Sequence, residues 1–153
     1  MIGAKLDTYA FGQWSNTLDR RLSDFRKPFE KMGAAARQEF ENTFEQSGPG
    51  WEPNRAGTET LVKTGDLRAS YVRLSAPGNI SGVSPAGANF GSSIPYASDH
   101  QNGGTITVIT KTGKRFQIKL PARPVVKEPP RLLADQFGQI AAAHLTVQAG
   151  DRR

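Results

Sequence analysis

Apolar residues recur every three or four positions through the first third of the chain. The series is Phe11, Trp14, Leu18, Leu22, Phe25, Phe29, Met32, Ala36, Phe40 and Phe44. This spacing is typical of one face of an α-helix. Pro28 interrupts the series, and proline costs about 3 kcal/mol inside a helix but little in its first turn. The pattern therefore predicts helix over residues 11–44, as two helices that meet near Lys27 or as one helix that bends there.

A continuous apolar helix face needs a cover. We expect the chain's own sheet to cover it, and the alternative is a neighbouring subunit that covers part of it. The run Ser47-Gly48-Pro49-Gly50 ends the helical region. Residues 51–60 read as an ordered loop in which Trp51 is the anchor.

A short helix is predicted next, from Thr60 to Tyr71. Thr64 is a suitable cap, and Asp66 would lie near the positive end of the helix. From Tyr71 the pattern changes to short strands. These are Tyr71–Ala76, Asn79–Val83, Ile94–Ala97, Thr105–Thr110 and Arg115–Leu120. Residues 84–93 are small and are expected to form a mobile loop.

The last two predicted strands form the clearest hairpin, around Lys111-Thr112-Gly113-Lys114. Strand alternation places Ile106 and Val108 on one face together with Phe116 and Ile118. The opposite face of the second strand carries Arg115, Gln117 and Lys119 and is expected to face water.

The remaining sequence predicts one irregular segment and one helix. Residues 121–130 are too rich in proline for regular structure, whereas Arg131–Leu145 returns to helical periodicity. The fold class is α+β, with a long N-terminal helical element, a small antiparallel β-sheet with hairpins, and a C-terminal helix. We expect a single domain over residues 1–153. Its parts are a helical arm (1–46), a loop and β-sheet core (47–120), and a Pro-rich segment with the C-terminal helix (121–148).

The net charge of +6 is unevenly distributed. Residues 1–46 carry seven basic and seven acidic side chains, so the whole excess lies in residues 47–153. Such a basic half faces nucleic acid, an acidic protein surface or only solvent. No apolar run approaches the roughly 20 residues that span a membrane, and the N-terminus has no secretory pattern. We therefore expect no membrane association and a cytoplasmic site of synthesis.

Chemistry-bearing motifs are scarce. The chain has no cysteine and only two histidines, so neither a disulfide nor a metal site is expected. Ser98-Asp99-His100 contains the residue types of a catalytic triad, but neighbours on an extended chain point to opposite sides. Lys63-Thr64-Gly65 and Thr112-Gly113-Lys114 lack the full phosphate-loop pattern. We expect no enzymatic activity and no cofactor.

A basic cluster lies at the hairpin tip. It consists of Lys111, Lys114, Arg115 and Lys119. No aromatic ladder accompanies it, so a contact with nucleic acid would involve phosphates without sequence choice. The alternatives are a solvated tip or a contact with another protein.

Four segments together resemble one protein family. They are Gly50-Trp51-Glu52-Pro53, the stretch Leu61–Ser70 with the pattern L-x-x-T-G-x-L-R-x-S, the stretch Tyr96–Gly104 with Y-A-x-x-H-Q-x-G, and Leu120-Pro121-Ala122-Arg123-Pro124. Their order and spacing, over roughly residues 30–146, are similar to those of phage virion morphogenesis (tail completion) proteins. The resemblance implies a structural virion protein that completes the tail or joins it to the head.

Such proteins act as rings of identical subunits around the DNA channel. The resemblance thus implies that the partners are further copies of the chain, with six suiting its size, and neighbouring neck and tail-tube proteins. Contact with packaged DNA is a further expectation. The expected location is the head–tail interface or tail of the virion, after assembly in the host cytoplasm. The competing hypothesis is a DNA-binding protein that contacts phosphates through its basic C-terminal half.

The motif residues are the candidates for fold or interface roles. They are Trp51, Thr64, Gly65, Leu67, Arg68, Tyr96, His100 and Arg123. The Arg68 fork suits a carboxylate or backbone carbonyls within or between subunits. Tyr96 and His100, expected at the end of a strand, would hold the hairpin base, where Gly103 and Gly104 allow close backbone approach. Arg123 is expected to be displayed between prolines. Internal packing is the favoured role for these residues, and a mixed fold and interface role is the second.

Overall fold

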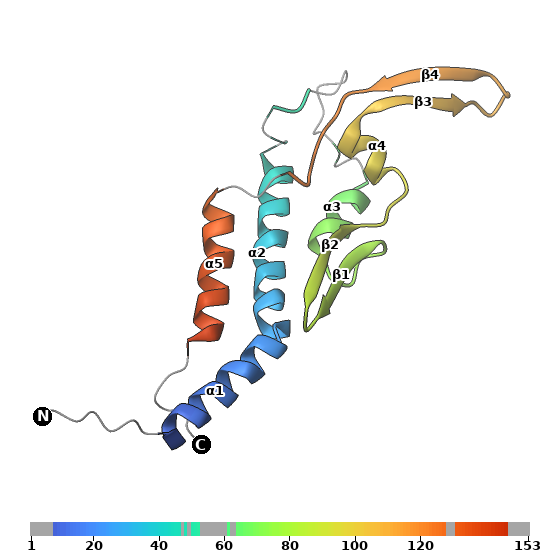
Figure 1. The fold of residues 1–153 in the computed structure, drawn as a ribbon. Helices are drawn as coiled ribbons and strands as arrows, with labels where there is room; N and C mark the ends of the chain where they lie inside the picture. Colours follow the sequence, from blue (N-terminus) through green and yellow to red (C-terminus); the bar gives the residue numbers. More distant parts are fainter. Residues whose placement is uncertain are drawn as a thin grey trace, which may run out of the picture.

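The computed structural model describes residues 8–46, 48, 50–52, 61, 64–127 and 131–146. The elements in these ranges are α1 (Thr8–Ser23), α2 (Arg26–Glu45), α3 (Asp66–Val72), β1 (Asn79–Ser84), β2 (Gly87–Ser92), α4 (Ala97–Asn102), β3 (Gly104–Ile109), β4 (Arg115–Leu120) and α5 (Arg131–Leu145). Figure 1 shows α2 flanked by α5 on one side and by α3, β1 and β2 on the other. This arrangement confirms the α+β class, although two separate two-stranded sheets replace the single small sheet.

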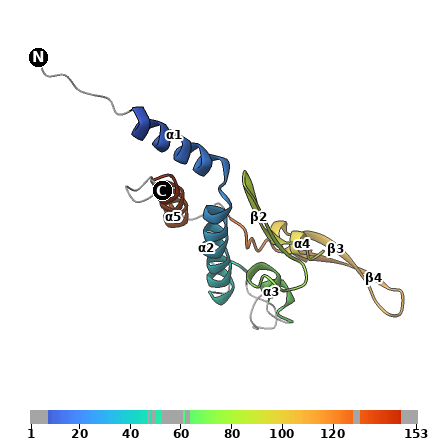
Figure 2. The ribbon, with the colours of Figure 1, turned by 90° about the horizontal axis from the view of Figure 1, so that it is seen from below.

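The N-terminal region forms two helices, as one of the two predicted alternatives required. The break falls at Asp24-Phe25, and α1 leaves at an angle to α2 (Figures 1 and 2). Pro28 is the third residue of α2, where a missing N–H removes no helical hydrogen bond. The Asp24 carboxylate accepts the backbone N–H of Arg26 at 3.0 Å and pairs with its guanidinium. These bonds to Arg26 lower the pKa of Asp24 to about 2.

Residues 84–93 do not form the predicted mobile loop. Pro85 and Ala86 turn the chain, and Gly87–Ser92 is strand β2, paired antiparallel with β1. Phe90 covers Gly33 of α2 so closely that a Cβ there would lie 2.4 Å from the ring. The small residues that indicated a loop instead allow the hairpin to lie against the helix.

Two predicted strands are turns and helix ends instead. Tyr71–Ala76 was expected to be extended, but α3 continues to Val72 and residues 73–76 form turns. Helical spacing places Leu67 and Tyr71 on one buried face. Ile94–Ala97 was also expected to be a strand, but the chain turns at Tyr96 and enters α4 at Ala97. Burial of Ala97 in the core overrides the weak strand pattern.

The β3–β4 hairpin confirms the clearest strand prediction. Ile106 lies opposite Ile118, and Val108 lies opposite Phe116, so these four share one face. The hairpin extends away from the helices (Figure 1). Helix α5 has the predicted bounds and packs along α2.

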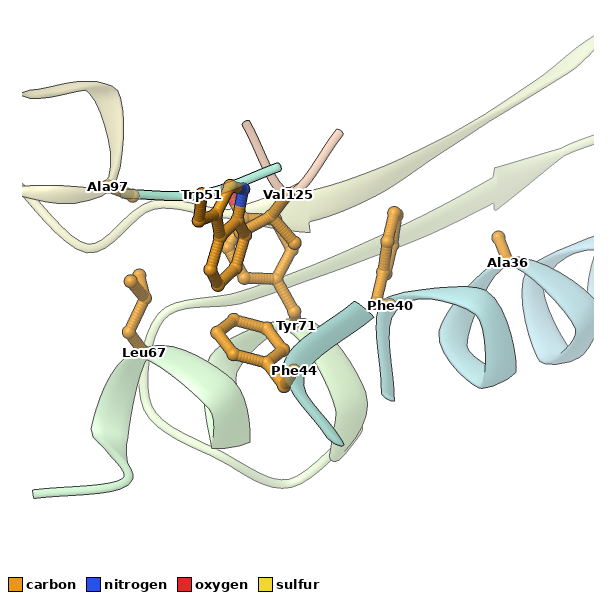
Figure 3. Packing of buried hydrophobic residues seen from close by; sticks show 8 residues of the cluster. All are labelled: Ala36, Phe40, Phe44, Trp51, Leu67, Tyr71, Ala97 and Val125. Atoms are coloured by element: carbon orange, nitrogen blue, oxygen red, sulfur yellow. The ribbon is translucent and has the colours of Figure 1, made fainter. Parts of the chain in front are cut away.

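The core gathers at the C-terminal end of α2 (Figure 3). Its members are Ala36, Phe40, Phe44, Trp51, Leu67, Tyr71, Ala97 and Val125. Phe40 meets Tyr71 edge-on at 5.3 Å between ring centroids, and Phe44 meets Trp51 edge-on at 6.0 Å. Trp51 is thus the anchor expected from the sequence, and residues 53–60 of its predicted loop lie outside the described residues.

The chain's own sheet covers α2 but not α1. The break at Asp24-Phe25 turns α1 away from β1 and β2 (Figure 1), and α1 instead contacts α5. Phe11, Trp14 and Leu22 remain exposed. The expectation of an intramolecular cover is therefore wrong for this helix. In the described parts of the chain, no helix combines the length and apolar character that crossing a membrane requires.

Candidate functional site

Three of the motif segments meet beside the core. A hollow of about 480 Å³ is lined by residues from all three: Leu61, Thr64, Asp66, Leu67, Tyr96, His100 and Arg123. The structure thus brings together five of the predicted residues: Thr64, Leu67, Tyr96, His100 and Arg123. Trp51 lies in the adjoining core.

Helix α4 holds the Pro-rich segment by hydrogen bonds to the backbone of that segment. The backbone N–H of Arg123 donates to the carbonyl oxygen of His100 at 2.7 Å. The Gln101 side-chain oxygen accepts the N–H groups of Val125 and Val126 at 2.9 and 3.1 Å, and its amide nitrogen donates to the Val126 carbonyl. We call this set, His100 and Gln101 with residues 123–126, the clasp. It supplies hydrogen bonds to a segment whose prolines prevent regular structure.

Gly103 allows the chain to turn from α4 into β3 beside the clasp. Its φ of +68° favours glycine. A Cβ at this position would lie 2.7 Å from the backbone nitrogen of Ala122 and 2.9 Å from the carbonyl oxygen of Leu120. Close backbone approach at the hairpin base therefore requires a glycine here.

Arg123 is not displayed as expected from its flanking prolines. Its exposed fraction is 7%, and its guanidinium donates to the carbonyl oxygen of Glu52 at 2.9 and 3.3 Å. The Trp51 indole N–H donates to the Pro124 carbonyl at 3.3 Å. The Arg123 guanidinium thus links the segment after β4 to the segment after α2, and this tertiary contact buries the side chain.

Tyr96 and His100 lie one helical turn apart, not at the end of a strand. Their rings meet edge-on at 6.0 Å between centroids. The His100 Nδ1 atom is buried and, within the described residues, has no hydrogen-bond partner. Burial lowers the pKa of His100, the charge of Arg123 adds to this, and Asp99 opposes it. A neutral imidazole suits this position.

The L-x-x-T-G-x-L-R-x-S segment places its polar groups against α2 and β2. Gly65, with φ of +77°, takes the cap position that Thr64 was expected to occupy. The Thr64 hydroxyl still accepts the N–H of Asp66 at 3.4 Å. Arg68 donates to both carboxylate oxygens of Glu41 and to Glu45 at 3.3 Å, which lowers the pKa of Glu41. These Arg68 contacts lie within one subunit.

Residues that were not chosen from the sequence also hold this site. Gln101 forms most of the clasp, and the fully buried Ser70 bonds Ser92 of β2 at 2.7 Å. Both stand inside the quoted motif segments, so the motif was a usable signal. Their individual roles depended on contacts with distant segments.

The four basic residues are spread along the hairpin. Lys111 and Lys114 lie in the turn and Arg115 follows it, whereas Lys119 pairs with Thr105 near the base, so the four do not all lie at the tip as expected. Lys111, Lys114, Arg115 and Lys119 are all exposed. Arg115 and Lys119 lie opposite Ile109 and Thr105 on the face that excludes Phe116 and Ile118. Across the described ranges, no three His, Asp or Glu side chains converge as a metal site would require.

The comparisons with known proteins agree with the motifs. The model of the phage virion morphogenesis family matches residues 6–128. The chain belongs to the phage virion morphogenesis family. Comparison with curated proteins and with solved structures gave no match.

The family match includes all four motif segments that carried the resemblance. It also includes α1, whereas α5 lies beyond its end. Membership in the phage virion morphogenesis family places this protein in the assembly of a phage virion, in a family that is typically structural. The clasp, the Gly103 turn and the exposed hairpin all fall within the matched residues.

The Gly103→Ala variant is expected to be destabilised because its Cβ meets backbone atoms at a positive φ. Gly113→Ala is the matched control, since Gly113 has φ of +79° but open space around it. The backbone strain alone costs about 1–2 kcal/mol, and the overlap at Gly103 adds roughly 1–3 kcal/mol. Urea unfolding measures both variants. Equal stability of the two would contradict the close approach at the hairpin base.

Stability is expected to fall as the pH drops below the ordinary histidine pKa of 6.5, because the folded-state pKa of His100 is lowered. The unfolded chain then binds the proton more readily, so the His100 contribution is complete above 6.5 and is lost toward lower pH. Urea midpoints between pH 7.5 and 5 test this. The decline in stability toward low pH should be smaller in His100→Gln. The control variant His144→Gln should still show the part of the decline that comes from His100. An unchanged decline in His100→Gln would refute the assignment.

Proposed function

We propose that this protein is a structural component that completes the phage tail or joins it to the head, acting as a ring of identical subunits. The observation that carries the proposal is the family match over residues 6–128. The ring would stand in the neck or at the top of the tail. Its neighbours would be neck and tail-tube proteins, and packaged DNA would pass through its centre.

The distribution of side chains supports binding as the working activity. Polar groups of the motif segments hold backbone, as Arg123 and Gln101 illustrate, and Ser70 bonds the side chain of Ser92. By contrast, the two elements that leave the body, α1 and the β3–β4 hairpin, expose aromatic and aliphatic side chains. Apolar side chains displayed on projecting elements favour contacts with other proteins.

A ring also suits the edges of the two small sheets. Each strand of a two-stranded sheet has one edge that lacks a partner strand within that sheet. Identical subunits that contact one another through different surfaces form closed rings when the rotation between them closes. We therefore propose that subunits associate through the sheet edges and the N-terminal helical region.

Removal of the gene from the phage genome is expected to leave unfinished tails or unjoined heads and tails. Electron microscopy of lysates counts the particles, and supply of the protein in trans should restore joined ones. Mass spectrometry of purified particles should detect the polypeptide. Normal infectious particles from the deletion would refute the proposal.

The second candidate function is binding of DNA phosphates without sequence choice. The observation in its favour is the exposed cluster of four cations on the hairpin. A free-standing DNA-binding protein should bind duplex DNA with an affinity that falls steeply with salt.

Binding to duplex DNA across a salt series separates the two candidates. Replacement of Lys111 and Lys114 by Gln should reduce the salt slope by about 2 if both contact phosphates. A Lys27→Gln/Lys31→Gln double variant on α2 is the charge-matched control. The absence of binding by the isolated protein at low salt would exclude this second candidate.

A further inference from the structure

The β3–β4 hairpin has one face made entirely of apolar side chains. We call Ile106, Val108, Phe116 and Ile118 the apolar hairpin face. Phe116 and Ile118 are 52% and 44% exposed. The opposite face carries Thr105, Thr107, Gln117 and the cations Arg115 and Lys119, with Ile109 near the turn. A lone two-stranded hairpin is marginally stable in water, so its apolar face needs a protein surface.

Helix α1 presents a second uncovered apolar surface. Phe11, Trp14 and Leu22, with the partly buried Leu18, recur at helical spacing; we call these four the α1 face. The first three are 60%, 47% and 54% exposed. Tyr9 lies on the other side of the helix, because two residues correspond to about 200° of rotation.

The two faces match in chemistry and in length. Eleven helical steps from Phe11 to Leu22 span roughly 16 Å, and a six-residue strand spans about 17–20 Å. The members of both faces are uncharged, so neither would place an unpaired charge in the contact. The hairpin and α1 stand at opposite ends of the molecule (Figure 1), so they are well placed to meet between copies.

We propose that the apolar hairpin face of one copy docks on the α1 face of the next copy. This inference rests on the proposed ring and specifies one of its subunit contacts. A single head-to-tail contact of this kind covers the apolar surface of both elements and repeats from copy to copy until the ring closes. It leaves the cationic face of the hairpin turned away from α1, toward solvent or the channel.

Thiol cross-linking between two variants tests the contact directly. The chain has no cysteine, so introduced thiols are the only ones present. Val108→Cys protein is mixed with Phe11→Cys or Leu22→Cys protein and treated with a short bismaleimide. A heterodimer is expected with at least one of the two, depending on the direction of docking. Thr107→Cys and Tyr9→Cys are the matched controls from the opposite faces and should cross-link at least tenfold less.

Assembly of the full chain provides the second measurement. Phe116→Asp should weaken self-association at least tenfold in sedimentation or native mass spectrometry. Gln117→Asp, on the same strand but the opposite face, should leave it unchanged. Circular dichroism checks that both variants fold, as expected for exposed positions.

The outcomes separate this inference from the proposed function. If Phe116→Asp assembles like the unaltered chain, or if cross-linking is absent or equal in the controls, the docking inference is wrong and the ring proposal stands. If the unaltered chain is monomeric but enters particles, the hairpin meets another virion protein or a strand edge, and the inference is again overturned. Normal particles from the gene deletion would instead overturn the proposed function itself.

Discussion

The aromatic contact among Phe44, Trp51 and Tyr71 is the interaction on which the rest of this structure depends. These three side chains come from α2, from the segment after it and from α3, and they pack at the C-terminal end of α2. Ala97 of α4 and Val125 of the Pro-rich segment pack into the same cluster. The core is small, so it positions the chain at one point and leaves the elements that extend from it without intramolecular cover.

The clasp connects the core to the base of the hairpin. Gln101 and the backbone of His100 hold residues 123–126, and Gly103 lets the two segments approach at the base of β3 and β4. Arg123 adds a buried link to the carbonyl of Glu52 beside the core. The hairpin is therefore anchored at its base by hydrogen bonds to backbone, while its length projects freely (Figure 1). A base held by hydrogen bonds and a projecting hairpin suit the proposed contact with a neighbouring subunit.

The clasp and the hairpin lie within the residues that match the phage virion morphogenesis family. The polar residues of the motif segments hold the base of the hairpin in place. The proposed contacts with other subunits and with DNA fall on the hairpin and α1. Motifs with buried side chains are thus compatible with the proposed binding role, since they determine where the exposed hairpin stands.

The sequence by itself determined the elements with strong periodicity: the helical N-terminal region, the β3–β4 hairpin and α5. It left open whether that region is two helices or one bent helix. Amphipathic spacing is a local property, so it survives whatever the chain packs against. The motifs also indicated the family and most of the residues around the hollow. Only the tertiary structure decided that residues 87–92 are a strand, that residues 97–102 are a helix, that Arg123 is buried and that α1 is uncovered. The first three depend on distant partners, namely Gly33 for Phe90, the core for Ala97 and Glu52 for Arg123, and no local pattern encodes such partners. The exposure of α1 follows from the direction that the chain takes at the Asp24-Phe25 break.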